Sequence, residues 1–154
     1  MPRITAVSLR ERKQQGDKIA MLTAYDFPTA HIVDAAGVDI VLVGDSCGNV
    51  VMGRPNTLTV TMDEMVHHTR MVSAAVQHAM VVGDMPFLSY QINPDEALRN
   101  AGRLIVEGGA QGVKLEGPVD KFGGAIAAIL RAGIPVMGHI GLTPQSVNRI
   151  GGYK

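Results

Sequence analysis

The stretch AAGVDIVLVGDS (residues 35–46) places a glycine, a short apolar segment and two polar residues in direct succession. Its centre, residues 39–44, is almost continuously apolar, which is typical of a strand buried on both faces of a parallel sheet. Gly37 before it is the kind of residue that ends a helix. Asp45 and Ser46 stand where the strand is expected to end. The stretch therefore predicts one helix–strand junction of an α/β protein.

The same order of features returns twice further along the chain. It appears as EGGAQGVKLEGP (residues 107–118) and as RAGIPVMGHIGL (residues 131–142). A helix end, a glycine, a short apolar strand and a polar residue in repetition indicate successive βα units. The repetition by itself favours neither an open doubly wound sheet nor a closed barrel.

Capping residues mark the helices between these units. Thr61 followed three residues later by Glu64 has the form of a capping box, and Asn93-Pro94 is a strong helix start. We expect helices to begin after Asp26, Thr61, Asn93 and Pro118. We expect strands at residues 18–24, 39–44, 80–83, 112–115 and 134–138, and a loop at residues 47–60. No linker interrupts the alternation, so residues 1–154 are expected to form a single domain.

Composition excludes several classes of protein. The 14 Lys and Arg balance 14 Asp and Glu, which leaves no electrostatic footprint for nucleic acid or an anionic membrane. A content of 46% hydrophobic residues excludes disorder. No segment reaches the roughly 18 apolar residues of a membrane span, and residues 1–18 contain no secretory signal. The one cysteine, Cys47, cannot form an intrachain disulfide, and we expect a cytoplasmic protein.

The length restricts the choice of fold. A (β/α)8 barrel typically takes about 250 residues, whereas these 154 residues supply five predicted strands and close on loop-like sequence. Two folds therefore agree with the pattern: a small open sheet, or the first five βα units of a barrel.

Polar residues follow the predicted strands, or in one case lie near the end of a strand, where parallel α/β folds bind ligands. They are Asp45, Ser46, Asp84, Lys114, Glu116 and His139. Side chains alternate along a strand with a period of two, so Lys114 and Glu116 are expected to share one face. The same rule predicts that Asp45 shares a face with Val43.

Three of these residues are carboxylates, which repel one another unless a cation lies among them. Asp45, Asp84 and Glu116 offer hard oxygen ligands, which predicts Mg²⁺ rather than zinc. Lys114 adds a positive charge suited to a substrate carboxylate or an enolate oxygen, and the Ser46 hydroxyl is suited to the same carboxylate. A lone Asp after a strand is more often a helix cap, so the hypothesis depends on the recurrence at successive strands.

Two further features have a structural interpretation. His67 and His68 are adjacent on a predicted helix and do not face the same way, which favours a solvated helix face over a metal site. Cys47 has no evident base beside it and is expected to be a small loop residue rather than a nucleophile.

Several long motifs carry a family resemblance. They are TAYD (23–26), VLVGDS (41–46), DMPF (84–87), VKLEG (113–117) and GHIGLTPQSVN (138–148), closing on GGYK (151–154). In this order they resemble ketopantoate hydroxymethyltransferase over residues 4–154. The resemblance implies a (β/α)8 TIM barrel that assembles into a homo-oligomer, a decamer in the family. The chain then corresponds to an N-terminal portion, about the first five βα units.

The resemblance also implies a reaction on the route to pantothenate. The family transfers a hydroxymethyl group from 5,10-methylenetetrahydrofolate to the α-keto acid 3-methyl-2-oxobutanoate, giving 2-dehydropantoate. Asp45, Asp84 and Glu116 resemble its Mg²⁺ ligands. The expected contacts to the keto acid are Asp45, Ser46, Asp84, Lys114 and His139.

One part of the family's pattern falls outside this sequence. The family's general base is a glutamate late in the barrel, and its position lies beyond Lys154. We therefore expect this chain to contain the metal and keto-acid half of the site without the deprotonating residue. Little turnover is expected from residues 1–154 alone.

Two alternatives stay open on the sequence. The phosphoenolpyruvate mutase and isocitrate lyase group also combines Mg²⁺ with α-keto acid enolates on a barrel, although its nucleophilic-cysteine loop is not evident here. A catalytically inactive half-barrel that serves as an assembly partner is the second alternative. Its unpaired sheet edges and uncovered inner face favour association.

Overall fold

The computed structural model describes residues 2–152, and its centre is a five-stranded parallel sheet. The strands are β1 (Met21–Thr23), β2 (Ile40–Val43), β3 (Met80–Asp84), β4 (Gly112–Glu116) and β5 (Val136–His139). They lie in the order β1-β2-β3-β4-β5, each hydrogen-bonded to the next. A doubly wound sheet reverses its order at a switch point, whereas a barrel keeps the order of the chain. The order therefore confirms part of a β/α barrel.

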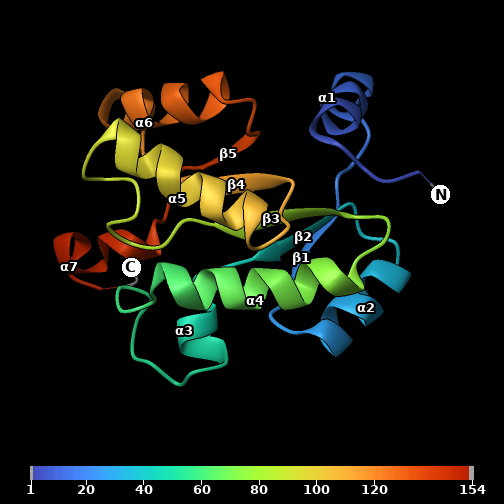
Figure 1. Cartoon of the computed structure of the whole chain (residues 1–154), viewed down its shortest axis with the longest axis horizontal. Helices are drawn as coiled ribbons and strands as arrows, with labels where there is room; N and C mark the ends of the chain where they lie inside the picture. The colour runs from blue at the N-terminus through green and yellow to red at the C-terminus, as the bar shows by residue number, and fades with distance from the viewer. Residues whose placement is uncertain (1, 153–154) are drawn as a thin grey trace.

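Helices connect the strands and cover one face of the sheet. These connecting helices are α2 (Phe27–Ala35), α4 (Met62–Ala75), α5 (Pro94–Val106) and α6 (Val119–Arg131). Figure 1 shows them following one another around the sheet, with α1 (Ala6–Gln15) set apart from them. Three short helical segments complete the described elements: α3 (Cys47–Val50), η1 (Pro144–Ser146) and α7 (Val147–Ile150). No helix within residues 2–152 combines the length and apolarity needed to cross a bilayer.

Hydrogen bonds at the helix starts confirm the predicted caps. The Thr61 hydroxyl accepts from the Glu64 amide at 3.2 Å, and the Glu64 carboxylate accepts from the Thr61 amide at 2.8 Å. Asp26 caps α2 by accepting from the amide of Thr29 at 2.8 Å. These bonds satisfy amide groups that the first helical turn leaves without a partner.

Three local expectations differ from the structure. Residues 47–60 are not entirely loop, because α3 begins directly after Ser46. The polar N-terminal region forms α1, a helix without a buried residue of its own, which is why its sequence carries little apolar signal. β2 ends at Val43, so Asp45 lies beyond the strand and outside the alternation that was expected to join it to Val43. The last two residues of the GGYK motif lie outside the described part of the chain.

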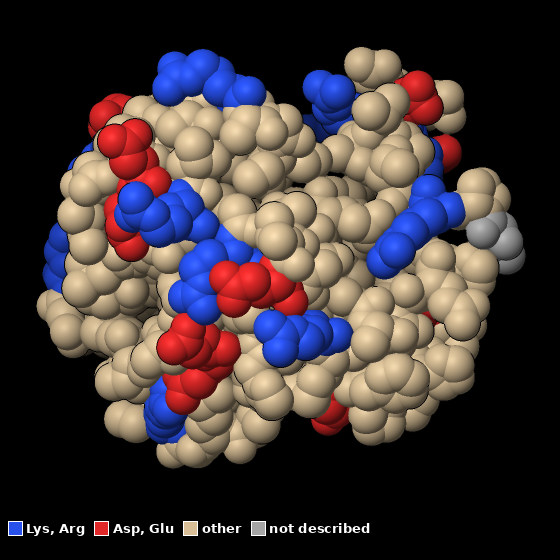
Figure 2. Space-filling view, in the orientation of Figure 1, with Lys and Arg blue, Asp and Glu red and all other residues tan. Residues whose placement is uncertain are grey.

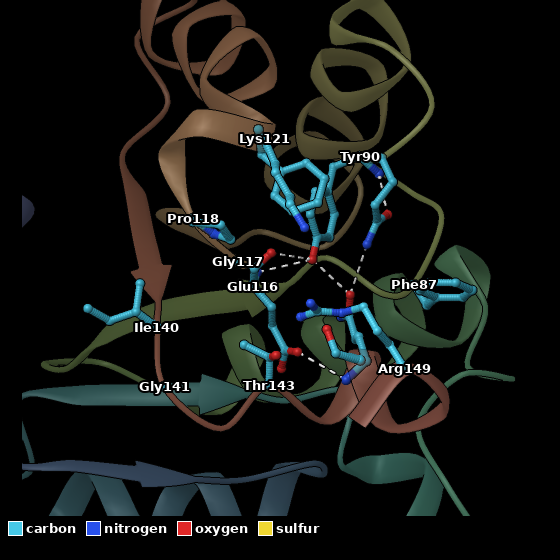
Figure 3. A pocket seen from close by; sticks show the side chains of 14 residues that line it. Phe87, Tyr90, Glu116, Gly117, Pro118, Lys121, Ile140, Gly141, Thr143 and Arg149 are labelled. Atoms are coloured by element: carbon cyan, nitrogen blue, oxygen red, sulfur yellow. Dashed lines mark hydrogen bonds between the residues drawn. The ribbon is translucent and has the colours of Figure 1, made fainter. Parts of the chain in front are cut away.

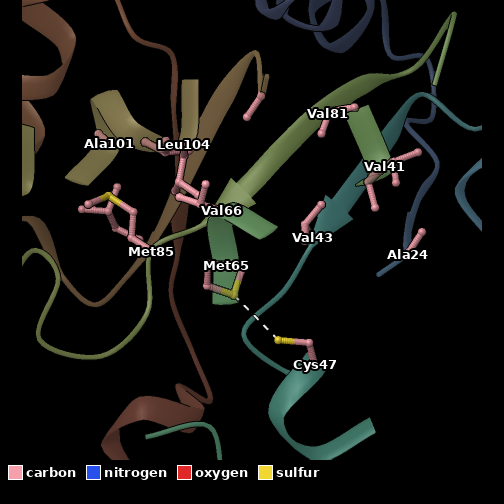
Figure 4. Packing of buried hydrophobic residues seen from close by; sticks show 14 of the residues in the cluster. Ala24, Val41, Val43, Cys47, Met65, Val66, Val81, Met85, Ala101 and Leu104 are labelled. Carbon is pink, nitrogen blue, oxygen red and sulfur yellow. Dashed lines mark hydrogen bonds between the residues drawn. The ribbon is translucent and has the colours of Figure 1, made fainter. Parts of the chain in front are cut away.

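The two faces of the sheet carry separate apolar clusters. The helix-facing side includes Val41, Val81 and Val113 in one large buried core. Figure 4 shows part of this core, including Cys47, whose Sγ lies 3.8 Å from Sδ of Met65. Burial raises the pKa of the Cys47 thiol to about 12. Cys47 is therefore a core residue at the start of α3 and not the small loop residue that the sequence predicted, and its raised pKa agrees with the expectation that it is no nucleophile.

The opposite face of the sheet carries the second cluster. Ile40, Leu42, Met80 and Val82 form it, and Ile4, Ala6 and Leu9 from the region of α1 pack against it. A groove of about 600 Å³ with a largely apolar lining runs between α1 and this face. The inner face of the incomplete barrel is thus covered by α1 at one end only.

Charged side chains of both signs lie close together on the face that carries α4 and α5 (Figure 2). Arg103 of α5 pairs with Asp63 of α4 at 2.7 Å and with Glu107 at 2.9 Å. Exposed pairs of this kind contribute little stability individually. Their interspersed signs agree with the net charge of zero.

A buried carboxylate ties α2 to the start of β3. Asp34, 6% exposed, accepts hydrogen bonds from the backbone amides of Ala79, Gln77 and His78 at 2.8, 2.9 and 3.2 Å. Burial acts to raise the pKa of Asp34, but these amides outweigh it and hold the pKa below its ordinary value. The ionised form is therefore the one that the fold requires.

Replacement of Asp34 by alanine is expected to lower the free energy of unfolding by about 2 kcal/mol at pH 7, because buried amides lose a charged acceptor. Since the folded-state pKa is depressed, this contribution is present at neutral pH and is lost as the pH falls below about 4. Urea unfolding at pH 7 and pH 3 measures both effects. Asp17→Ala, at an exposed position, is the matched control. A loss for Asp34→Ala no larger than for the control would contradict the assigned role.

Candidate functional site

Strand register brings four of the predicted site residues into one row, a series of side chains in contact along the carboxyl ends of β3, β4 and β5. Asp84 of β3 stands opposite Lys114 of β4, and Glu116 of β4 stands opposite His139 of β5. Lys114 and Glu116 share a face because they are two residues apart on one strand, as the sequence predicts. Side chains opposite each other on neighbouring strands lie within contact distance. The row therefore follows from the register of the parallel strands.

A buried ion pair begins this row. Lys114 Nζ lies 2.7 Å from Asp84 Oδ2 and 3.8 Å from Glu116 Oε1. All three side chains are buried, with Asp84 only 1% exposed. Burial raises the pKa of Asp84 to about 7 against the lowering effect of Lys114, and nearby Asp45 raises it further. The other oxygen of this carboxylate, Asp84 Oδ1, is buried and has no hydrogen-bond partner in the part of the chain that the structure describes.

Glu116 is held at both carboxylate oxygens. Oε1 lies 3.2 Å from Nδ1 of His139, and Oε2 accepts from the backbone amide of Gln145 at 3.1 Å. His139 is partly exposed at the end of β5 and contacts Glu116 from the neighbouring strand. Glu116 is therefore fixed by groups of the chain itself.

Asp45 joins the row from the loop after β2. Its carboxylate Oδ2 accepts from the Gln145 side-chain amide at 2.9 Å, and its backbone amide donates to Asp84 Oδ2 at 3.3 Å. The residue is 3% exposed. β2 ends at Val43, and Asp45 follows at its carboxyl end beside β3, so Asp45 and Asp84 lie together at the strand ends as expected.

Ser46 stands at the edge of the site with a partner that the sequence did not indicate. Its hydroxyl lies 2.8 Å from the hydroxyl of Tyr25, and the Tyr25 carbonyl lies 2.7 Å from Nδ1 of His68. The sequence predicted that His67 and His68 face different ways, which is confirmed, and favoured a solvated helix face, which is wrong for His68 because it is buried. Their position on successive helix residues turns one inward and the other outward.

Two residues central to the site carried no recognisable signal. Figure 3 shows Tyr90 reaching toward Glu116 in a pocket of about 270 Å³, with dashed lines at its hydroxyl. That hydroxyl lies 2.8 Å from Oε1 of Gln145 and accepts from the amide of Glu116 at 3.1 Å. Gln145 occurs in the motif GHIGLTPQSVN, but neither its spacing nor its residue type indicates a contact with Asp45, 100 positions earlier.

The fit of these residues to a divalent cation depends on the donor atoms. Within residues 2–152, no group of three or more His, Cys, Asp or Glu side chains is arranged to hold a metal. Both oxygens of Glu116 are engaged, whereas the buried Oδ1 of Asp84 has no hydrogen-bond partner among residues 2–152 and its Oδ2 accepts from the backbone amide of Asp45. Mg²⁺ in proteins commonly takes one or two carboxylates and completes its shell with water and substrate. The donor set of Asp45 and Asp84 fits that pattern.

Comparison with known proteins gives a family match over almost the whole chain. The model of the family described as ketopantoate hydroxymethyltransferase matches residues 3–154. The 3-methyl-2-oxobutanoate hydroxymethyltransferase of Syntrophomonas wolfei is 58% identical over 154 residues, which are 100% of this chain and 55% of that protein. The enzyme of the same name from Acetivibrio thermocellus is 58% identical over 152 residues, 99% of this chain and 53% of its own length. The chain thus spans about half the length of these relatives.

Solved structures share the fold at low sequence identity. A phosphonopyruvate hydrolase superposes with a TM-score of 0.72 at 15% identity, covering 88% of this chain and 51% of the hydrolase. A 2,3-dimethylmalate lyase of the PEP mutase/isocitrate lyase superfamily has a TM-score of 0.64 at 21% identity, covering 88% and 52%. At these identities the likeness concerns the fold alone. It agrees with the partial barrel that the strand order indicates.

Replacement of Lys114 by methionine tests the buried ion pair. Without a divalent cation, the loss in free energy of unfolding is expected to be about 3 kcal/mol at pH 8, because an ionised Asp84 is left buried without its partner. The loss is expected to be clearly smaller at pH 5, below the Asp84 pKa of about 7, where the carboxyl is neutral in the folded state.

Urea unfolding at the two pH values measures the difference. Lys13→Met, on the exposed side of α1, is the control and is expected to change little at either pH. Equal losses for Lys114→Met at pH 5 and pH 8 would contradict the assignment of a raised pKa to Asp84.

Proposed function

The chain belongs to the ketopantoate hydroxymethyltransferase family, and from this we propose that its protein transfers a hydroxymethyl group to 3-methyl-2-oxobutanoate. The proposed donor is 5,10-methylenetetrahydrofolate and the product 2-dehydropantoate, a step of pantothenate and coenzyme A biosynthesis. One observation carries the proposal beyond the family match. A buried Lys–carboxylate pair with an unpartnered oxygen lies beside a second carboxylate at the carboxyl ends of the strands.

We propose Mg²⁺ as the cofactor, held by Asp45 and Asp84. When bound, it would supply Lewis-acid stabilisation of negative charge on the keto oxygen as C3 of the substrate loses its proton. Support comes from the hard oxygen donors of the two residues and from the unpartnered Oδ1 of Asp84. Glu116 remains a proposed ligand, and its engaged oxygens favour a contact through water.

The side chains around these carboxylates suit an α-keto acid. Lys114 pairs with Asp84, and its positive charge is suited to the negative charge that develops on the keto oxygen of the substrate. Ser46, held by Tyr25, presents a hydroxyl suited to the substrate carboxylate, and His139 is partly exposed beside Glu116. We propose Asp45, Ser46, Asp84, Lys114 and His139 as the keto-acid contacts.

Proton removal from the substrate needs a positioned base. Glu107 at the end of α5 is paired with Arg103 on the surface and does not serve this site. We propose that the base and much of the folate surface belong to the part of the relatives that this chain does not span. The homo-oligomer and the cytoplasmic location stay predictions of the sequence.

The family match assigns the chain to the hydroxymethyltransferase family rather than to the phosphoenolpyruvate mutase and isocitrate lyase group. The likeness to the phosphoenolpyruvate mutase and isocitrate lyase group is one of fold, at 15% to 21% identity in the two structures described above. The hypothesis of an inactive half-barrel makes a different prediction from the proposed function, because it requires no binding of Mg²⁺ or keto acid.

Replacement of Asp84 by asparagine is expected to weaken Mg²⁺ binding at least about tenfold and to abolish Mg²⁺-dependent binding of 3-methyl-2-oxobutanoate, because a carboxylate ligand becomes a neutral amide. Isothermal titration calorimetry on the full-length protein measures the binding of Mg²⁺ and of the keto acid. Asp63→Asn is the control, since the Asp63 side chain is 84% exposed on α4. Unchanged affinity in Asp84→Asn would remove Asp84 from the ligand set.

Turnover is tested with keto acid, methylenetetrahydrofolate and Mg²⁺. We expect residues 1–154 alone to form little 2-dehydropantoate, and we expect addition of the remaining half of the barrel as a second chain to restore the reaction. Product formation is followed by mass spectrometry. Near-full activity of residues 1–154 alone would refute the proposal that the base lies elsewhere.

A further inference from the structure

Gln145 lies inside the candidate site without a role in the proposed reaction. It belongs to η1, after β5, and is 6% exposed. Its side chain reaches Asp45 at the end of β2, and its backbone reaches Glu116 at the end of β4. A buried side-chain amide is expected to have a hydrogen-bond partner for each of its polar atoms. The partners of the Gln145 amide therefore show which groups it holds in place.

The partners of Gln145 determine which way the amide points. Nε2 donates to Asp45 Oδ2 at 2.9 Å and to the carbonyl of Met85 at 3.0 Å. Oε1 accepts from the hydroxyl of Tyr90 at 2.8 Å and from Nε2 of Gln91 at 3.1 Å. The reverse orientation would place a carbonyl oxygen against a carboxylate and another carbonyl, so only one orientation satisfies the amide.

This orientation has a consequence for Asp45. Its Oδ2 is held by the amide, which fixes the rotation of the carboxylate about the Cβ–Cγ bond. Among residues 2–152, no hydrogen bond is donated to the other oxygen, Oδ1. The bond from Gln145 therefore leaves one oxygen of Asp45 available while Asp84 Oδ1, on the neighbouring strand, is unpartnered.

The same residue links the two sides of the site. The Gln145 amide N–H holds Glu116 Oε2, and Tyr90 contacts both Gln145 and the backbone of Glu116. Asp45 follows β2 and Glu116 ends β4, and these two strands lie on either side of β3 with its Asp84. Gln145 thus sets the relative positions of two carboxylates that no strand pairing brings together.

We propose that Gln145 is a positioning residue, which orients Asp45 so that Oδ1 and not Oδ2 faces the cation. The inference rests on the proposed function, because it assigns the cation to Asp45 and Asp84. Groups that orient metal ligands by hydrogen bonding typically change metal affinity 10- to 100-fold when they are removed, roughly the range expected here. A residue that only filled space would change stability and leave affinity intact.

Gln145→Met keeps the side-chain volume and the backbone bond to Glu116 but removes the bond to Asp45. We expect it to raise the dissociation constant for Mg²⁺ by about tenfold or more, measured by titration calorimetry on the folded full-length protein. With Mn²⁺ as the probe, electron paramagnetic resonance is expected to report a changed coordination environment. Gln77→Met, the same exchange at an exposed position, is expected to stay within about twofold of the unsubstituted protein.

A second control separates positioning from stability. Asn100 is a buried amide on α5 that donates to the Ser89 carbonyl at 2.8 Å and to Glu96 Oε1 at 3.3 Å, and not to the carboxylates of the candidate site. Asn100→Ala is expected to lower the thermal midpoint without weakening Mg²⁺ binding. If Gln145→Met does not fold, Tyr90→Phe tests the same claim, because it removes a donor that holds Gln145 Oε1. Several-fold weaker Mg²⁺ binding is expected for that variant.

The outcomes distinguish this inference from the proposed function. If Gln145→Met binds Mg²⁺ as tightly as the unsubstituted protein, the positioning role is overturned and the proposed function stands. Where Gln145→Met does not fold, the same result for Tyr90→Phe leads to the same conclusion. Absence of Mg²⁺ binding in the unsubstituted protein would overturn both. Weakened binding in Asn100→Ala equal to that in Gln145→Met would show a general effect of lost stability, and would also overturn the positioning role.

Discussion

The pairing of Lys114 with Asp84 is the interaction on which the rest of the site depends. A carboxylate that is 1% exposed is stable in its charged form only beside a compensating charge, and strand register supplies the lysine at 2.7 Å. The ion pair does not satisfy every charged oxygen, because Asp84 Oδ1 has no partner among the described residues and Glu116 Oε1 lies 3.8 Å from the same lysine. An arrangement with an excess of negative charge and one unsatisfied oxygen suits a site that receives a cation.

Stability and site occupy different parts of the same strands. Val81 and Val113 face the helices and belong to the large core, while Asp84 and Lys114 stand in the row at the carboxyl ends. The alternation of side chains along each strand makes this separation possible. Charged residues can therefore collect at the strand ends while the apolar core remains continuous beneath the helices.

Fold and family give different kinds of information about this chain. The barrel-like sheet is shared with hydrolases and lyases at identities near 15% to 21%, where only architecture is common. Family membership instead comes from 58% identity to named hydroxymethyltransferases over nearly the whole chain. The chemistry of Asp45, Asp84 and Lys114 is what connects the shared architecture with the transfer reaction proposed here.

The sequence by itself determined the βα units, the capped helix starts such as Thr61 with Glu64, and the polar residues after the strands, because these depend on local periodicity and hydrogen bonding. It left open whether the sheet was open or part of a barrel, which strand order decided. It did not reveal α1, whose polar residues bury nothing of their own, nor the inward turn of His68. The contact of Gln145 with Asp45 joins residues 100 positions apart, and no local pattern encodes such a contact. Only the tertiary structure brings those two side chains together, because their distance depends on the packing of every element between them.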